Sequence, residues 1–317
     1  MLELRRSHAR MTTPITLRLA VLMTVPPLLW AGNAVMGRLA VGHVPPLTLN
    51  ALRWALALVI LLPWAWPAVA TREARAALLL RWKPLALLGL LGVGAYNALQ
   101  YLALTTSSPL NVTLIAASMP VGMLAIGAAF YRTRPTPREL LGAALSLAGV
   151  AVVLARGEWS QLAAVRFVPG DVLMIGAVAA WAFYSWQLAR PHPLLAGDAR
   201  PPWDWAGFLF AQMLFGVVFA GAAAIGEAVV MPEQSVRWSP WVIALLAYVA
   251  VGPALIAYRC WGMGVAAAGP AVAAFFSNLT PVFAAVLSAA LLGEAPQGYH
   301  ALAFGLIVAG IVASARR

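Results

Sequence analysis

The chain has 317 residues, of which 62% are hydrophobic and only 10% are charged, and its mean hydropathy is +0.85. A soluble domain averages about 45–50% apolar and about 25% charged residues, so a single water-soluble globule is excluded. The net charge of +11 does not indicate a nucleic-acid partner, because the basic residues separate long apolar stretches instead of forming a patch. A single cysteine, Cys260, excludes an intrachain disulfide. The composition predicts a polytopic membrane protein.

About 20 residues cross the hydrocarbon core as a helix, and helices are required because lipid offers no partner for backbone polar groups. Two stretches without charge, 84–131 and 260–293, are too long for one span, and turn-forming residues divide each of them. The sequence therefore predicts an all-α protein with ten transmembrane helices. They are 19–38, 47–66, 84–104, 109–131, 138–155, 171–190, 205–227, 239–262, 270–291 and 298–315.

Basic residues predict the orientation of these helices, because loops rich in Lys and Arg favour the cytoplasm. Of the 21 Lys and Arg residues, 15 fall on the side of the N-terminus, 4 on the other side and 2 within predicted helices. We therefore expect a multi-pass protein of the inner membrane with both termini in the cytoplasm. A cleaved signal peptide is the alternative for the first apolar run, but its 19 residues are long for one and have an internal counterpart.

The two halves of the chain match one another. At an offset of 161 residues three prolines have counterparts, and at an offset of 151 residues Trp30 matches Trp181. The three proline pairs are Pro109 with Pro270, Pro120 with Pro281, and Pro135 with Pro296. Each half has five predicted helices, an odd number, so the second half must be inverted relative to the first. The sequence predicts two inverted five-helix repeats, 16–156 and 170–315, around a central cavity.

The second half carries a recognisable pattern, which is Leu279-Thr280-Pro281-Val282-Phe283, then Leu291-Leu292-Gly293-Glu294, then Gly305 and Gly310. The chain resembles the EamA-type exporters of the drug/metabolite transporter superfamily over residues 16–315, and is most similar to their aromatic amino-acid exporter branch. The first half departs from the pattern, with Tyr131-Arg132 in place of Leu292-Gly293 and no acid at Thr133. The resemblance implies that the first, third, fourth, sixth, eighth and ninth helices line the cavity and that the fifth and tenth are peripheral.

Small residues at four-residue spacing predict close packing of these two peripheral helices. In the tenth helix they are Gly305, Ala309 and Ala313, and in the fifth they are Gly142 and Ser146.

Polar and aromatic residues within the spans are the candidates for substrate binding, because each must find a partner away from water. Nearly all of them fall on the six helices expected to line the cavity. The predicted set is Trp30, Asn33, Tyr96, Asn97, Tyr101, Trp181, Tyr184, Tyr258 and Asn278. The alternatives are that the asparagines only link helices and that the tryptophans only pack.

Pro120 and Pro281 lie near the middle of matched spans, and we expect them to form hinges or gates, with static kinks as the alternative. Arg53 and Arg259 are the charges within predicted helices. We expect Arg259, near the end of its helix, to extend to the membrane surface, and Arg53 to do the same or to meet a carboxylate.

No Asp or Glu lies in the middle of a predicted span, so a carboxylate proton relay lacks its central residue. The sequence thus favours a carrier that exports neutral or zwitterionic metabolites, amino acids above all, as a uniporter without a cofactor or a bound metal. Proton-coupled export of other drugs or metabolites is the main alternative. A membrane enzyme would need clustered His, Asp or Glu, and a channel would favour a continuous polar ring.

Overall fold

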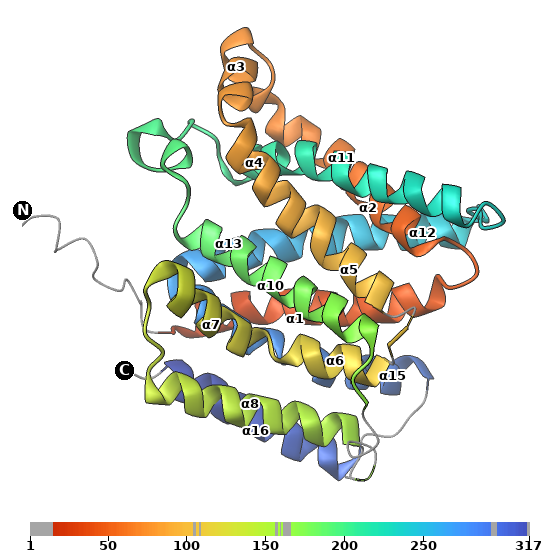
Figure 1. Cartoon of the computed structure of the whole chain (residues 1–317), viewed down its shortest axis with the longest axis vertical. Coiled ribbons are helices and arrows are strands. Elements are labelled where there is room, and N and C mark those ends of the chain that lie inside the picture. The colour runs from red at the N-terminus through yellow and green to blue at the C-terminus, as the bar shows by residue number, and fades with distance from the viewer. Residues whose placement is uncertain are drawn as a thin grey trace, which may run out of the picture.

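In the computed structural model, which describes residues 15–103, 106–107, 109–155, 158, 160, 166–292 and 297–315, every regular element is a helix (Figure 1). In the first half these are α1 (Leu17–Leu39), α2 (Pro46–Ala65), α3 (Arg72–Leu80), α4 (Trp82–Leu88), α5 (Tyr96–Ala103), α6 (Pro109–Ala117), α7 (Met119–Tyr131) and α8 (Pro137–Ala155). In the second half they are α10 (Pro169–Ala189), α11 (Trp205–Val230), α12 (Pro240–Val249), α13 (Ala257–Ala268), α14 (Pro270–Ser277), α15 (Thr280–Leu292) and α16 (Gly298–Ala315). Three 3₁₀ turns, Trp66–Ala68, Pro193–Leu195 and Gly197–Ala199, lie in the connections.

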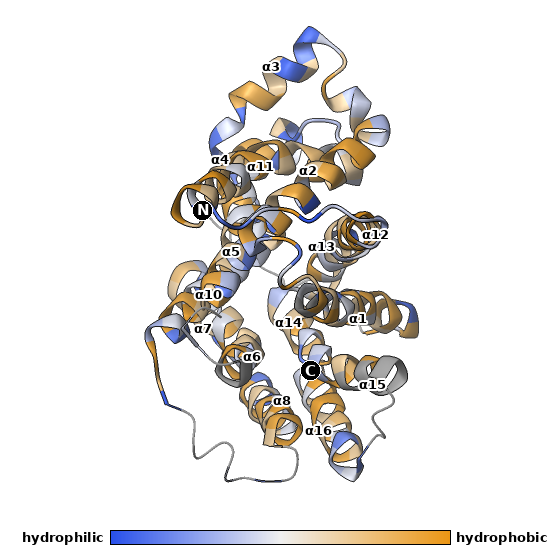
Figure 2. Cartoon of the chain, turned by 90° about the vertical axis from the view of Figure 1, so that its right-hand side faces the viewer, coloured by the Kyte–Doolittle hydropathy of each residue, from blue (hydrophilic) through white to orange (hydrophobic). Residues whose placement is uncertain are grey.

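The predicted all-α polytopic fold is confirmed. Within the described residues, eight helical spans are long and apolar enough to cross a membrane, and shorter apolar helices accompany them. Figure 2 shows apolar residues covering the outside of these helices and hydrophilic residues gathered at α3 and at helix ends. The apolar exterior is what a lipid environment requires of a protein whose helices satisfy their own backbone groups.

Two of the predicted spans are broken, which corrects the expectation of one continuous helix over 109–131 and over 270–291. The first consists of α6 and α7, which meet at Ser118, and the second of α14 and α15, which meet at Asn278 and Leu279. In each case a proline, Pro120 or Pro281, is the second residue of the helix that follows the break. Proline has no N–H to donate and its ring collides with the carbonyl four residues earlier, so the chain cannot continue as a regular helix.

Two other spans widen into π-helix for seven residues. The segment η3 (Gly89–Ala95) joins α4 to α5, and the segment η6 (Ala250–Ile256) joins α12 to α13. These segments begin 161 residues apart, which is the same offset that relates Pro109 to Pro270. Isolated π-helical turns are rare and occur frequently at functional sites. Their presence at matching positions therefore draws attention to the third and eighth spans.

Sequence signals at the helix starts explain where these helices begin. Proline occupies the first turn of α2, α10, α12 and α14, where its missing N–H costs no hydrogen bond. Asp204 accepts a hydrogen bond from the Gly207 N–H at 2.8 Å at the start of α11. Before α8, Thr136 and Glu139 form a reciprocal pair, in which each side chain accepts from the other residue's backbone N–H.

Helices α8 and α16 pack side by side at one end of the molecule, whereas α3 lies at the other end (Figure 1). Their contact runs through Gly142, Ser146 and Gly310, all buried. A Cβ atom added to Gly310 would lie 2.4 Å from the Ser146 Oγ, and one added to Gly142 would lie 2.7 Å from the Gly310 carbonyl oxygen. The prediction for Gly142 and Ser146 therefore agrees with the structure.

The predicted close packing is wrong for Gly305 and Ala309, whereas Ala313 is partly buried. Gly305 and Ala309 are exposed, and an added Cβ on Gly305 would meet nothing within 4 Å. Helix α16 has small residues on more than one face, so four-residue spacing alone does not identify the face that touches α8.

We expect Gly310→Leu to destabilise the protein, because a side chain at this position forces α8 and α16 apart. Overpacking of this kind costs about 1–3 kcal/mol. The melting temperature of the purified protein in detergent measures the effect, and Gly305→Leu on the same helix is the matched control. Equal melting temperatures for the two variants would contradict the assigned contact face.

Candidate functional site

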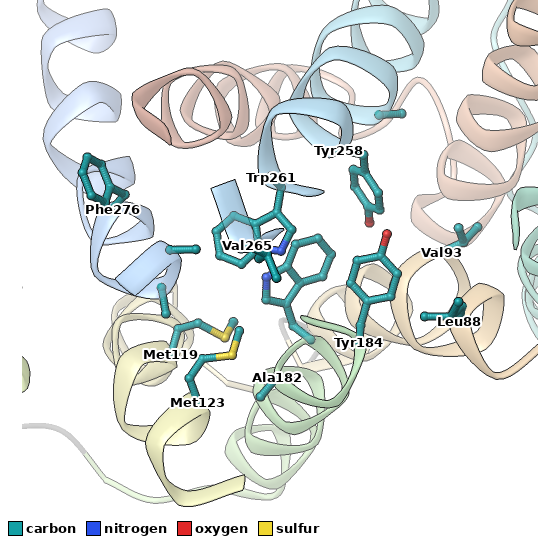
Figure 3. Close-up of a cluster of buried hydrophobic side chains, with 14 of the residues drawn as sticks. Leu88, Val93, Met119, Met123, Ala182, Tyr184, Tyr258, Trp261, Val265 and Phe276 are labelled. Carbon is teal, nitrogen blue, oxygen red and sulfur yellow. The ribbon is translucent and has the colours of Figure 1, made fainter. Parts of the chain in front are cut away.

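Seven aromatic residues form a connected group in the core, which we call the aromatic cluster. They come from α1, α2, α5, α10 and α13. They are Trp30, Trp54, Tyr96, Trp181, Tyr184, Tyr258 and Trp261. Four of these five helices belong to the set that the resemblance implies for the cavity lining, and α2 is the addition. In Figure 3, Tyr258 of α13 points towards Tyr184 of α10, and Trp261 lies on the same helix as Tyr258.

Trp181 is the centre of this cluster. Its ring centroid lies between 5.1 and 5.5 Å from the ring centroids of five other members. The contact with Trp30 is edge-to-face at 87°, a preferred geometry for aromatic rings. Trp30 and Trp181 are the two tryptophans matched in the sequence at an offset of 151, and they meet at the junction between the two halves.

Hydrogen bonds to the two π-helical segments orient the cluster. The Tyr258 hydroxyl donates to the carbonyl oxygen of Gly92 in η3, and the Trp30 Nε1 donates to the carbonyl oxygen of Pro253 in η6 at 3.3 Å. Gly92 and Pro253 are themselves 161 residues apart. The same carbonyl in each half therefore accepts a hydrogen bond from an aromatic side chain on another helix.

Gly92 also permits the close approach of α10 to this segment. A Cβ atom at this position would lie 2.6 Å from Cε2 of the Tyr184 ring. On the other side of the cluster, the Trp261 Nε1 donates to the Ser185 Oγ at 3.0 Å, and that hydroxyl donates to the Trp181 carbonyl at 2.9 Å. These bonds satisfy the polar atoms that burial of Trp261 and Ser185 removes from water.

The structure brings together five of the predicted substrate-binding residues, and these are the cluster members Trp30, Tyr96, Trp181, Tyr184 and Tyr258. Among the ring contacts of the described residues, none in this cluster involves Tyr101, which is half-buried on α5. That all of these residues bind a substrate stays a prediction.

Of the three predicted asparagines, two are close in sequence to members of the cluster, and the third lies at the break in the ninth span. Asn33 is one helical turn beyond Trp30 on α1, and Asn97 is buried on α5 next to Tyr96. Asn278 is 2% exposed, lies at the break between α14 and α15, and has no hydrogen-bond partner for its Nδ2. An unpaired buried amide nitrogen is uncommon in folded proteins, so Asn278 is a group that a polar ligand could satisfy.

Pro120 is buried and Pro281 is half-buried, each one residue beyond the start of the second part of a broken span. Their position after the breaks fits a hinge or gate, which stays a prediction.

Two members of the cluster, Trp54 and Trp261, are not among the residues predicted from the sequence. Trp261 follows Tyr258 by three residues, so helical spacing places both on one face of α13, and this signal was available. Trp54 lies on the second helix, outside the expected lining, and no spacing pattern pointed to it. Its ring lies 4.9 Å from that of Tyr258, at 80°.

The surroundings of the two arginines within spans differ from those predicted. Arg53 is 3% exposed and donates hydrogen bonds to Asn33 and Asn50, so it does not extend to the membrane surface. Arg259 lies nine residues before the end of α13, because that helix continues to Ala268 rather than ending at 262. Its guanidinium stacks on the Trp205 ring at 4.3 Å, beside a pocket of about 310 Å³.

The comparisons with known proteins agree with this architecture. The model of the EamA-like transporter family matches residues 17–155 and 168–316. An uncharacterized transporter of Archaeoglobus fulgidus is 25% identical and covers 92% of this chain and 95% of its own length. The aromatic amino acid exporter YddG of Ancylobacter novellus is 27% identical over 89% of this chain and 92% of its own. A solved crystal structure has the same fold, with a TM-score of 0.69 at 24% identity over 93% of this chain and 96% of the other.

Proposed function

This chain belongs to the EamA-like transporter family and is a membrane transporter rather than an enzyme; from that premise we propose that it exports small neutral or zwitterionic metabolites, above all amino acids with aromatic or bulky side chains. In this proposal residues 16–156 and 170–315 act as two inverted halves that alternate the access of one site. The protein lies in the inner membrane with both termini in the cytoplasm. Its partners are the substrate and the lipid bilayer.

The aromatic cluster is the observation that carries the proposal. Rings from both halves of the chain meet at Trp181, and hydroxyl and amide groups lie next to them. A site of this kind suits a solute with an apolar body and a few polar groups, because rings cover the body and fixed polar atoms orient it. The relative from Ancylobacter novellus that is named an aromatic amino acid exporter supports the same class of substrate.

The charges support transport without proton coupling. Among the described residues, the carboxyl groups buried at the ends of spans are already engaged, Asp171 with the Ser107 hydroxyl and Glu227 with the start of α2. Neither belongs to the aromatic cluster. A proton-driven exporter would place a titratable carboxyl group in the transport path. We therefore propose facilitated diffusion.

Efflux of radiolabelled phenylalanine, tryptophan and methionine from loaded proteoliposomes tests this function. We expect saturable efflux of at least one of them, at a rate that a pH gradient of either sign leaves unchanged. Liposomes without protein are the control. Absence of saturable efflux of all three would refute the amino-acid proposal. Strict dependence of efflux on the pH gradient would favour the alternative function, that of a proton-coupled exporter.

A further inference from the structure

Arg53 is a buried cation whose hydrogen-bond partners are neutral. It lies in α2, seven residues after Pro46, and its side chain is 3% exposed. The Nη1 donates to the Asn33 Oδ1 at 3.3 Å, and the Nη2 donates to the Asn50 Oδ1 at 3.0 Å. The Nε is buried and has no partner. Two amide oxygens therefore face a full positive charge, and one of the three guanidinium nitrogens has no hydrogen-bond partner.

This arrangement is unusual in a membrane-spanning helix. Burying a charged arginine within a membrane span costs free energy unless the arginine pairs with a carboxylate or lines a polar path. No carboxylate of the described residues forms an ion pair with Arg53. The Glu227 carboxylate, which also contacts α2, accepts from the backbone N–H groups of Leu47 and Thr48 instead. The guanidinium is thus left without a countercharge from the part of the chain that the structure describes.

The guanidinium also borders the aromatic cluster. It lies 5.1 Å from the centroid of the Trp54 ring, which in turn packs edge-on against Tyr258. Its partner Asn33 is three residues beyond Trp30 on α1, which is about 4.5 Å of helix rise. A charged group and an aromatic surface are therefore within the span of one small molecule.

We propose that Arg53 binds the carboxylate of the transported solute, and that Asn33 and Asn50 hold the guanidinium in position between transport events. The planar fork of arginine matches the two oxygens of a carboxylate, and the unused Nε supplies one side of that fork. The inference rests on the proposed function and makes it narrower, because it requires a carboxylate on the substrate, with the apolar part of the solute among the rings of the cluster.

Ligand-dependent melting of the purified full-length protein tests the inference without transport. The probes are L-phenylalanine, 3-phenylpropionate, which lacks the amine, and L-phenylalaninamide, which lacks the carboxylate. We expect both carboxylates to raise the melting temperature at concentrations at least tenfold lower than the amide does. In Arg53→Gln the effective concentration of both carboxylates is expected to rise about 10- to 100-fold, with that of the amide unchanged.

Arg259→Gln is the matched control, because it removes the other arginine within a span, on α13 and outside the cluster. We expect it to keep the preference for carboxylates. Equal stabilisation by carboxylates and amide in the wild type, an equal loss of all three in Arg53→Gln, or stabilisation of the wild type by sodium chloride to the same extent would overturn the inference.

Asn50→Asp keeps the proposal testable if Arg53→Gln fails to fold. The new carboxylate would stand where the Asn50 Oδ1 now accepts from Arg53, so it would pair with the guanidinium inside the protein. We expect a higher melting temperature without ligand and about tenfold weaker stabilisation by phenylalanine. Unchanged stabilisation by phenylalanine in a folded Asn50→Asp variant would contradict a carboxylate site at Arg53.

The two proposals fail in different ways. If phenylalanine and 3-phenylpropionate stabilise the protein through Arg53 but no amino acid is transported, the carboxylate site stands and the amino-acid proposal falls. If phenylalanine is transported and Arg53→Gln transports phenylalanine and phenylalaninamide with unchanged KM values, the exporter stands and the carboxylate site falls.

Discussion

Trp181→Ala is expected to abolish saturable amino-acid efflux and to lower the free energy of unfolding by about 3–5 kcal/mol, the usual cost of removing a large buried aromatic side chain. Trp181 is 4% exposed, and its ring contacts those of five other residues in the aromatic cluster. Its removal opens a void at the junction of the two halves and leaves Trp30 without its edge-to-face partner. Proteoliposome efflux and thermal melting in detergent measure the two effects.

Two further variants separate the role of Trp181 in transport from its role in stability. Trp181→Phe keeps a ring at the same place, and we expect it to retain measurable efflux with a smaller loss of stability. Trp238→Ala is the matched control, since Trp238 is 62% exposed. Efflux by Trp181→Ala at the wild-type rate would show that the cluster is structural packing alone.

Glu227→Ala is expected to destabilise the protein by about 2–4 kcal/mol, because three donors at the start of α2 then lose their acceptor. The Glu227 carboxylate accepts from the Leu47 N–H at 2.9 Å, from the Thr48 N–H at 2.7 Å and from the Thr48 hydroxyl at 2.9 Å. Helix α2 begins after Pro45, which has no side chain able to cap it. A carboxylate on α11 therefore caps the N-terminus of α2 and interacts favourably with the positive end of that helix.

Thermal melting tests this cap, and Glu233→Ala, which removes an exposed acid just beyond α11, is the control. We expect Glu227→Gln to recover part of the loss, because an amide oxygen still accepts one bond but carries no charge. A melting temperature for Glu227→Ala within one degree or so of that of Glu233→Ala would show that water or another group caps α2 equally well.

The helices were predictable because hydropathy and turn-forming residues determine them directly. The bounds of α8, α10 and α16 agree with the predicted spans to within about two residues. The prolines of the fourth and ninth spans indicated a disturbance, and in the structure Pro120 and Pro281 are each the second residue of the helix that follows a break. The π-helical segments were not predicted, because a change from α to π bonding leaves an apolar sequence equally apolar.

The candidate site was predictable where a residue is polar or aromatic within an apolar span, as for Trp30, Trp181 and Tyr258. It was not predictable where the neighbours decide the role of a residue. Arg53 became a candidate only when its side chain was found against two amides and away from any carboxylate of the described residues. The contact face of α16 was missed for the same reason, because small residues such as Gly305 and Gly310 look alike in sequence.

The π-helical segments have a further consequence for how the faces of α5 and α13 are counted. A π-helical turn contains about one residue more than an α-helical turn. Every side chain after it is therefore rotated about the helix axis by about 100°, the angle of one residue, relative to a continuous α-helix. Tyr96 follows η3 directly, and Tyr258 lies two residues beyond the end of η6. Regular helical periodicity counted from Trp82 or Pro240 would therefore assign both tyrosines to the wrong face. Because both halves carry this phase shift at the same position, it cancels when the halves are compared, and the 161-residue offset continues through it unchanged.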